Sequence, residues 1–431
     1  MTVAIDLRSS AVPLNRLLYA FYLTGFLFVG GGFVLVTSGA DLRLASEPGA
    51  GSALSQTILA FFYCSGSLLL LGNRNMTPVL TRAWPILLLP LLAMLSTVWS
   101  PDPLLSLRRA GAFAGTTVFG LSLGAAYARR DLIALIGRGL SLACVLSCAM
   151  VVVYPLYGVH QPGDAIQAIH AGAWRGIFGH RNTLGLWAGV AFAVVLVFGR
   201  DCFSHLTTRG VALLAAVACL VGARSSTGFV IAAVMTALSL VLLAFCRQSP
   251  AHKGIFALIV ALAAVVLLLL RDEIAAWALH LLDRDSDLTG RTLLWYFILQ
   301  IVEKTPSLFG SGYFTGFFTL DSEVSALLQT SFGSAHNGYL ETFIYLGYAG
   351  LAVCVAVVAW LIFCAARHML TMHVHEPRPA VFPLAVISII VIHNFVETTI
   401  ILPNNLNALL AAALAGMLVL AKQPSQTTPF S

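Results

Sequence analysis

The sequence predicts an all-α, polytopic membrane protein with about twelve transmembrane helices and one long loop. Its composition is the first reason, because 59% of its 431 residues are hydrophobic and only 10% are charged. Soluble globular proteins average about 25% charged residues. Apolar segments long enough for a span also recur along the whole chain, and the longest polar stretch, residues 271–336, lies between two of them. We therefore treat residues 1–431 as a single integral membrane domain.

The expected spans are separated by short polar loops, except before the tenth span. Their approximate limits are 17–38, 54–72, 84–99, 108–127, 132–154, 180–199, 210–223, 228–246, 255–270, 337–366, 380–398 and 403–421. The stretch 210–246 can also be read as one long helix that is broken around Arg224. Within the long loop, two short helices are expected, one beginning near Asp287 and one over residues 318–330.

The distribution of Lys and Arg predicts the orientation in the membrane. With a cytoplasmic N-terminus, every cytoplasmic segment carries at least one positive charge, as the positive-inside rule requires. The outer face then receives residues 156–179, the turn at Arg224 and the long loop. Arginines collected on that face depart from the rule and indicate an anionic partner there. They are Arg175, Arg181, Arg224, Arg271, Arg284 and Arg291.

The cysteines and acidic residues do not indicate a metal or a cofactor. The eight cysteines lie mostly in apolar runs and include no CxxC pair, so the sequence predicts neither a disulfide framework nor a zinc site. Three acidic residues alternate in the long loop, and we interpret them as capping and solvating residues. They are Asp283, Asp285 and Asp287.

A helix in the long loop places an arginine in its first turn. Asp287 or Thr289 can cap its N-terminus, and Pro306 ends it. Arg291 then lies where unpaired backbone N–H groups and the helix dipole both favour an anion. Its guanidinium also offers paired donors that suit phosphate. The structural alternative is a surface arginine that pairs with Asp285 or Asp287.

A second polar cluster lies at the mouth of the sixth expected span, at His180, Arg181 and Asn182. Polar side chains at such a position cost free energy unless they are paired or hydrated. Together with Arg175 upstream and Arg224 at the next outer turn, they form candidates for anion binding. The structural alternatives are interfacial anchoring, helix packing and a snorkelling arginine.

A third cluster, His336 with Asn337 and Glu341, lies where the long loop enters the tenth expected span. A neutral histidine there can accept a proton from a hydroxyl group. A histidine with a purely structural role is the alternative. The next-to-last expected span carries a further polar set that either lines the same cavity or forms internal hydrogen bonds. This set consists of His393, Asn394 and Glu397.

Four segments carry a resemblance to a known family. They are residues 95–103, 178–185, 288–295, and 334–341 with Gly347 and Gly350. In this order, with a long loop before the last, they resemble the O-antigen ligase and polysaccharide polymerase family of bacterial inner membranes. The likeness covers residues 85–360.

The resemblance implies about twelve helices, a large periplasmic loop and a polyprenyl-diphosphate-linked glycan donor. Members transfer that glycan in the periplasm, without a nucleotide sugar and without a metal. The family's loop arginine and histidine match Arg291 and His336. Its earlier arginine is best matched by Arg224, and Arg181 stands where relatives often have lysine.

We therefore expect an inner-membrane glycosyltransferase with catalytic His336 and Arg291. The residues expected to bind the donor diphosphate are Arg291, Arg224, Arg181 and Arg175. The expected supporting residues are His180, Asn182, Asn337 and Glu341. The acceptor is either a second lipid-linked repeat, as in a polymerase, or lipid A-core, as in a ligase. Residues 178–182 and 288–295 slightly favour the polymerase.

A transporter or flippase of lipid-linked glycans is the alternative from another class. Transporters place their substrate sites near the midplane of the bilayer. In this sequence the polar residues gather at one face instead, which favours the enzyme.

Overall fold

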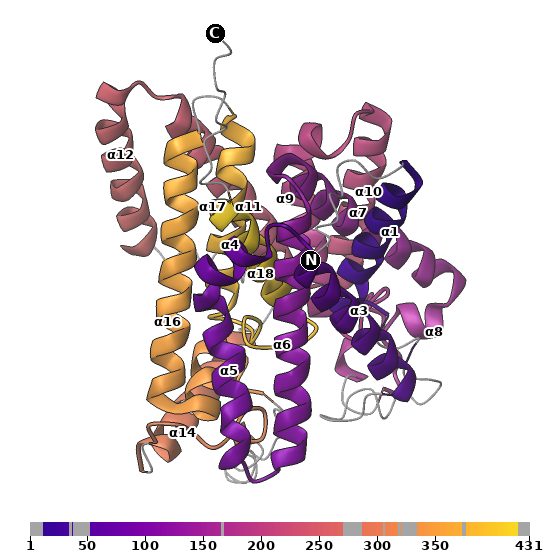
Figure 1. Cartoon of the computed structure of the whole chain (residues 1–431), viewed down its shortest axis with the longest axis vertical. Helices are drawn as coiled ribbons and strands as arrows, with labels where there is room; N and C mark the ends of the chain where they lie inside the picture. The colour runs from indigo at the N-terminus through magenta and orange to yellow at the C-terminus, as the bar shows by residue number, and fades with distance from the viewer. Residues whose placement is uncertain are drawn as a thin grey trace, which may run out of the picture.

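The computed structural model describes residues 12–33, 37, 52–164, 168–269, 287–304, 307–317, 320, 334–372 and 376–420. These residues form a bundle of long helices (Figure 1). Apart from an isolated bridge between Val159 and Trp174, the part of the chain that the structure describes contains no β-structure. The expected all-α class is confirmed for these residues.

A helix, or a short run of helices, overlaps each of the expected spans. The longer helices are α1 (Val12–Val29), α3 (Ala53–Leu71), α6 (Pro103–Ala126), α7 (Arg129–Val153), α9 (Arg181–Cys202), α10 (Leu206–Ala223), α11 (Ser226–Arg247), α12 (Pro250–Leu269), α14 (Asp287–Lys304), α16 (Gly338–Met372), α17 (Pro377–His393) and α18 (Leu406–Leu420). Shorter helices are α4 (Met76–Arg82), η1 (Trp84–Leu87), α5 (Leu88–Leu95), η2 (Ser96–Val98), α8 (Pro155–Gly158) and η3 (Ala168–His170). Among the described helices, 6 are long and apolar enough to cross a membrane, or up to 7 if one bent pair is a single span. The chain is therefore a polytopic membrane protein.

The expected helix over residues 84–99 is not continuous. Residues Met76–Arg82 and Trp84–Val98 form a pair of helical segments bent by 70°. Pro85 lies at the start of η1, and Pro90 follows in α5. Because proline lacks an N–H donor and restricts the residue before it, this stretch divides into short α and 3-10 segments.

The expected span over residues 380–398 ends early. Helix α17 stops at His393, and residues 394–405 make turns before α18 begins. The cause is local, because the side chain of Asn394 accepts hydrogen bonds from the backbone N–H groups of Thr399 and Ile400. Such side-chain bonds compete with the helix. Glu397 consequently lies in a turn at the end of the bundle and not inside a span.

The stretch 210–246 forms two helices and not one broken helix. Arg224 ends α10 in the left-handed conformation, with φ of 49°. The Ser225 hydroxyl then caps α11 by accepting a bond from the Gly228 N–H. This turn places Arg224 and Ser225 beside the start of α9.

Small residues set the close packing of the central helices. A Cβ atom on Gly124 of α6 would lie 2.1 Å from the Ala413 carbonyl oxygen of α18. Likewise, a Cβ atom on Gly228 of α11 would lie 2.8 Å from the Gly185 Cα of α9. Close approach at small residues is typical of packed membrane helices. The α9–α11 contact holds the starts of both helices at one end of the bundle.

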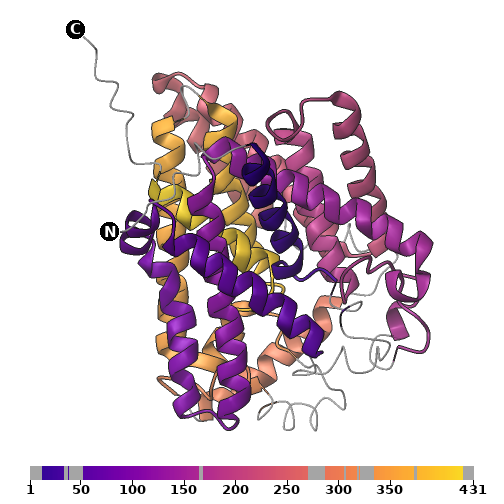
Figure 2. The same cartoon turned by 45° about the vertical axis from the view of Figure 1, so that its right-hand side comes forward.

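Helix α14 lies at the lower end of the molecule, whereas the end of α16 and the start of α17 lie at the upper end (Figures 1 and 2). The helix expected at Asp287 in the long loop is α14 and is confirmed. The second short helix, expected over residues 318–330, lies outside the described residues, apart from the isolated residue 320.

The first of the four family-like segments anchors the chain just before the site. The Ser96 hydroxyl accepts a bond of 2.9 Å from the Tyr313 N–H, and the Ser106 hydroxyl donates one of 2.6 Å to the Tyr313 carbonyl. The hydroxyls of Ser100 and Thr315 lie 2.8 Å apart. Residues 95–106 therefore fix the strip 313–315 to the bundle, which indicates a structural role for that segment.

Candidate active site

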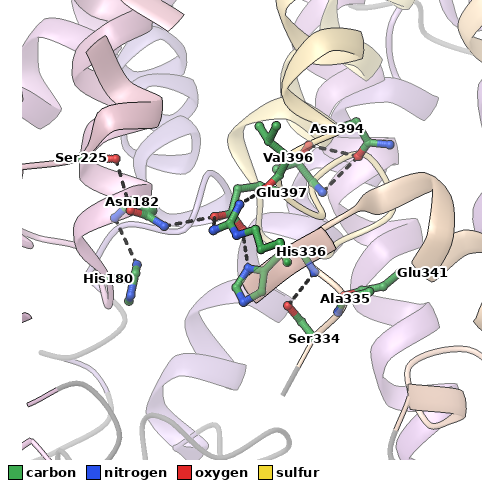
Figure 3. Close-up of polar contacts among 12 residues, drawn as sticks. His180, Asn182, Ser225, Ser334, Ala335, His336, Glu341, Asn394, Val396 and Glu397 are labelled. Carbon is green, nitrogen blue, oxygen red and sulfur yellow. Dashed lines mark hydrogen bonds and ion pairs between the residues drawn. The ribbon is translucent and has the colours of Figure 1, made fainter. Parts of the chain in front are cut away.

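A single carboxylate, that of Glu397, connects three segments that are distant in the sequence (Figure 3). Its Oε2 atom lies 3.0 Å from His336 Nδ1. Its Oε1 atom lies 3.0 Å from an Arg291 terminal nitrogen and accepts a bond of 3.0 Å from the Asn182 amide. The site thus joins the start of α9, the start of α14 and the residues that lead into α16.

The protonation of this group follows from its surroundings. Burial by itself would raise the pKa of Glu397, but the hydrogen bond and charge of His336 and the charge of Arg291 lower it to about 2. The carboxylate is therefore ionised at neutral pH and only accepts hydrogen bonds. His336 Nδ1 must then carry the proton of their shared bond.

The other ring nitrogen of His336 is consequently the basic one in the neutral imidazole. None of the residues that the structure describes forms a hydrogen bond with His336 Nε2, and the side chain is 32% exposed. The ring therefore presents a proton acceptor to the outside of the site, while Glu397 holds its other edge.

Backbone bonds fix the position of His336. The residue adopts the left-handed conformation, with φ of 48°, which is uncommon for non-glycine residues. Its N–H donates to the Ser334 hydroxyl at 3.2 Å. The preceding residue, Ala335, donates its N–H to Glu341 Oε1 at 2.8 Å and accepts a bond of 2.8 Å from the Trp295 indole. Glu341 thus stabilises the loop before His336, and its expected supporting role in the reaction stays a prediction.

Asn394 connects the turn of Glu397 to the start of α16. It is fully buried. Its Oδ1 atom accepts bonds of 3.2 Å and 3.1 Å from the N–H groups of Thr399 and Ile400. Its carbonyl accepts a bond of 2.8 Å from the Gly338 N–H. These contacts set the spacing between Glu397 and His336.

Arg291 points its guanidinium at the same turn. One terminal nitrogen donates to the Val396 carbonyl at 2.5 Å, and the other bonds Glu397. The side chain is 21% exposed. Its partner is therefore Glu397. Of the two aspartates that the sequence offered as partners, Asp285 lies outside the described residues, and so does the side chain of Asp287.

Arg181 and Arg224 lie next to this group. Arg181 donates a bond of 2.7 Å to the Arg224 carbonyl, and the Arg224 side chain is exposed. The Ser225 hydroxyl donates a bond of 3.2 Å to Asn182 Oδ1, and Asn182 in turn bonds Glu397. The structure therefore brings both arginines to the end of the bundle that carries Arg291 and His336.

Arg175 occupies a different environment. Its side chain is only 3% exposed, and it pairs with Asp164 at 2.8 Å. Two further donors bond the carbonyls of Tyr157 and Leu156, which both lie in α8. Through these contacts Arg175 stabilises the loop in which it lies. The expected binding of donor by Arg175 stays a prediction.

His180 caps α9, because its Nδ1 atom accepts a bond of 3.1 Å from the Asn182 N–H. Its ring centroid lies 5.5 Å and 5.4 Å from those of His160 and His170. Burial, with help from His160, lowers the pKa of His180 to about 3, so the ring is neutral at physiological pH. His180 therefore orients Asn182.

Asn337 has a similar capping role. Its Oδ1 atom accepts bonds of 3.0 Å and 3.1 Å from the N–H groups of Tyr339 and Leu340 at the start of α16.

Within the described ranges, no group of three or more His, Cys, Asp or Glu residues is suited to holding a metal ion.

Sequence reasoning noticed Glu397 and Asn394 but did not include them among the site residues. It placed both in a span because they follow an apolar run. The available signal was an ionisable residue in a predicted membrane segment, which marks a functional position by default.

Two comparisons with known proteins bear on this site. Residues 211–355 match a family model described as O-antigen ligase, and this range includes Arg224, Arg291 and His336. The chain is also 25% identical over 385 residues to the exopolysaccharide production protein ExoQ of Rhizobium meliloti (strain 1021). The aligned residues are 86% of this chain and 85% of that protein. These comparisons confirm the resemblance to the O-antigen ligase and polysaccharide polymerase family that the motifs indicated.

Proposed function

We propose that this protein is an inner-membrane glycosyltransferase of surface-polysaccharide biosynthesis. It transfers a polyprenyl-diphosphate-linked glycan to an acceptor hydroxyl on the periplasmic face of a membrane domain with about twelve spans. The observation that carries this proposal is the bridge that Glu397 makes between His336 and Arg291. It combines a proton acceptor and a cation at one end of a helical bundle.

In the proposed reaction, His336 Nε2 accepts the proton of the acceptor hydroxyl. The hydroxyl oxygen forms a bond to the anomeric carbon of the donor glycan, and the bond from that carbon to the diphosphate oxygen breaks. Polyprenyl diphosphate leaves with the bonding electron pair. Arginine donors that face the leaving group stabilise its growing charge, which is a large contribution in sites of this kind.

Glu397 supports this reaction through its two partners. Its carboxylate keeps the proton of the neutral imidazole on Nδ1 and stabilises the imidazolium that forms. It also holds one terminal nitrogen of Arg291, while the Val396 carbonyl holds the other, so that the N–H groups left on the guanidinium can face a phosphate. Glu397 is thus a positioning residue.

The acceptor distinguishes two forms of the proposal. A polymerase uses a second lipid-linked repeat, and a ligase uses lipid A-core. The relative from Rhizobium meliloti is named an exopolysaccharide production protein, which favours the polymerase. Transport of the lipid-linked glycan is less favoured, because Glu397 joins a proton acceptor and a cation, which are the groups that a transfer reaction needs.

The test uses the purified full-length chain with a polyprenyl-diphosphate oligosaccharide, alone and together with lipid A-core. Release of polyprenyl diphosphate and longer lipid-linked glycans from the donor alone would support a polymerase. Release only in the presence of lipid A-core would support a ligase. No release in either arm, with unmodified donor crossing a liposome membrane, would contradict the proposal and support a flippase. A parallel arm with EDTA should retain full turnover.

A further inference from the structure

Two imidazole rings cap the N-terminus of α9. His180 Nδ1 accepts a bond of 3.1 Å from the Asn182 N–H, and His160 Nε2 accepts one of 3.2 Å from the Arg181 N–H. These are two of the N–H groups that a helix leaves unpaired at its start. We propose that these two rings and His170, which contacts both, form an acid-sensitive cap that releases the start of α9 on protonation and thereby lowers turnover. The effect on turnover rests on the proposed function, whereas the release of the helix does not.

The two bonds fix where each capping ring carries its proton. A nitrogen that accepts a hydrogen bond has no proton of its own, so the neutral rings are protonated on Nδ1 of His160 and on Nε2 of His180. A second proton can enter each ring only at the nitrogen that caps α9. It would replace the acceptor with a donor that faces a backbone N–H, and the helix dipole also disfavours a cation there. Protonation of a capping ring therefore excludes capping.

The three rings of this histidine cap lie against one another in the loop before α9. Ring centroids are 5.8 Å apart for His160 and His170, 5.5 Å for His160 and His180, and 5.4 Å for His170 and His180. The side chain of His160 is fully buried, whereas His170 and His180 are half-buried. Solvent protons thus reach the cap, and a charge on one ring acts on the other two.

The charges around the cap do not stabilise an added proton. Among the described residues, the charged or titratable groups that face the two capping rings are Asp164, Arg175, His170, Arg181 and Glu397. The Asp164 carboxylate already pairs with Arg175, and Glu397 already bonds Arg291 and His336. Arg224 borders the same loop, because a Cβ atom on Gly172 would lie 3.7 Å from one of its terminal nitrogens.

The closed cap consequently favours neutral rings. Burial and the charge of Arg175 lower the pKa of His160 from its ordinary value of 6.5 to about 4, although Asp164 acts in the opposite direction. Burial and the neighbouring His160 lower the pKa of His180 to about 3. The contribution of the cap to stability is therefore complete above about pH 6.5 and is lost as the pH falls toward the pKa values of the closed cap.

The start of α9 transmits the state of the cap to the candidate active site (Figure 3). The Asn182 amide donates a bond of 3.0 Å to Glu397 Oε1 and accepts one of 3.2 Å from the Ser225 hydroxyl. The neighbouring Arg181 donates a bond of 2.7 Å to the Arg224 carbonyl. Release of the helix start would therefore remove a partner of Glu397 and separate Arg181 from the Arg224 turn.

Hydrogen exchange tests the cap without any substrate. The full chain in lipid nanodiscs is measured at about pH 7.5 and about pH 5.5, and each rate is divided by the intrinsic rate at that pH. Residues 179–185 should exchange about tenfold faster at the lower pH for each capping histidine, and about a hundredfold faster for both. The start of α11 is the internal control, because the Ser225 hydroxyl that caps it does not titrate. Equal protection of residues 179–185 at both pH values would overturn the proposal.

Substitutions that keep the acceptors but remove the titration give the second measurement. His160→Gln places an amide oxygen near the position of Nε2, and His180→Asn places one near Nδ1 in a residue type favoured at helix N-termini. The double variant should keep its protection at the lower pH. His252→Gln, at an exposed histidine that bonds Ser249, is the matched control and should retain the wild-type response. If the double variant misfolds, His180→Asn alone should reduce the response to about tenfold. A full response in a well-folded variant without the titrating rings would overturn the cap.

The acid side of the pH–rate profile tests the effect on turnover. One titrating base such as His336 gives about a tenfold loss of kcat for each pH unit. The cap adds a second loss, so kcat should fall more steeply than this in the wild type and in His252→Gln, but not in the double variant. Equal slopes in all three proteins would overturn the effect on turnover.

The two proposals fail separately. A protein that transfers no glycan at any pH would contradict the proposed function, while the exchange of residues 179–185 would still decide the cap. Glycan transfer with pH-independent exchange would overturn the cap and leave the transferase.

Discussion

His336 and Glu397 are 61 residues apart in the sequence, yet His336 Nδ1 lies 3.0 Å from Glu397 Oε2. Two helices, α16 and α17, run away from this point and back before the chain returns to it. The contact leaves only one nitrogen of the imidazole to act on a ligand. It also makes the chemistry of His336 dependent on a residue of a different segment.

Replacement of His336 by alanine should remove turnover while the protein still binds donor lipid. General acid–base assistance contributes roughly 10²–10⁴-fold in rate, so kcat should fall by about that factor. Turnover and donor affinity are measured on the same purified variant. A well-folded His336→Ala protein with normal turnover would remove the histidine from the mechanism.

His336→Ala also needs a control for folding, because Glu397 loses a partner in this variant. Thermal unfolding of the variant should remain close to that of the wild type. Lower stability with full activity per folded molecule would show that the histidine has a structural role only.

Glu397→Gln should reduce turnover and also change the pH dependence of stability. The pKa of Glu397 is about 2 in the folded protein, well below the ordinary value of 4.5 for a glutamate, so its ionised form is stabilised by folding. That contribution is complete above the unfolded value and is lost as the pH falls toward the folded one. The wild type should therefore be more stable than Glu397→Gln from pH 5 to 7, and the difference should shrink below about pH 4.5. A difference in thermal midpoint that stays constant down to pH 3 would contradict this assignment.

Much of the fold follows from the sequence, because the apolar segments that bury themselves in a membrane are long and separated by charged loops. The N-terminal signal at Asp287 likewise predicts α14, and the polar residues after the loop predict a site at His336. These inferences depend on local patterns of hydrophobicity, capping and charge. The structure confirms the helices, and the roles of the site residues stay predictions.

The partner of His336 could not be predicted in the same way. Glu397 follows an apolar run, which predicts that it lies in a span. It lies outside the helix because the Asn394 side chain accepts hydrogen bonds from the backbone just after it. Such contacts form only after the chain has folded. Similarly, Arg175 has the charge expected of a phosphate ligand, but its pairing with Asp164 depends on the path of the loop between them.

Asn394→Ala should separate the positioning of Glu397 from its charge. The variant leaves the buried N–H groups of Thr399 and Ile400 without their side-chain acceptor. An unsatisfied buried donor costs about 1–3 kcal/mol, so the free energy of unfolding should fall by an amount of that order. Because the turn would shift, kcat should fall more than the affinity for donor.

The matched control for that variant is Asn405→Ala. Its side chain accepts a bond from the Asn407 N–H in the next turn, away from Glu397. Equal losses of kcat in both variants would show that general loosening of residues 394–405, and not the position of Glu397, limits the rate.

Labelling of introduced cysteines should give the orientation of the bundle. Ile169 is 87% exposed in the loop after α8, and Ser249 is exposed between α11 and α12. If the candidate active site faces the periplasm, Ile169→Cys should react with an impermeant maleimide in outer-membrane-permeabilised cells. Ser249→Cys should react only after the inner membrane is opened. The unmodified protein is the reference, because it has eight cysteines of its own. The reverse pattern would place the site in the cytoplasm.

Arg291 should differ from His336 in the step that it affects. Its guanidinium carries a charge that both a bound diphosphate and a departing one would need, so Arg291→Ala should weaken donor binding as well as turnover. Arg291→Lys retains the charge but loses the paired geometry of the donors, and it should recover only part of the affinity. Donor affinity is measured by displacement of a labelled polyprenyl diphosphate, and kcat is measured with saturating acceptor. Loss of Arg291 also leaves Glu397 without one of its partners, so Asn182→Ala, which removes a neutral partner of the same carboxylate, is the control. If Arg291→Ala and Asn182→Ala lose turnover equally while both keep full affinity for donor, Arg291 acts through Glu397 and does not contact the diphosphate.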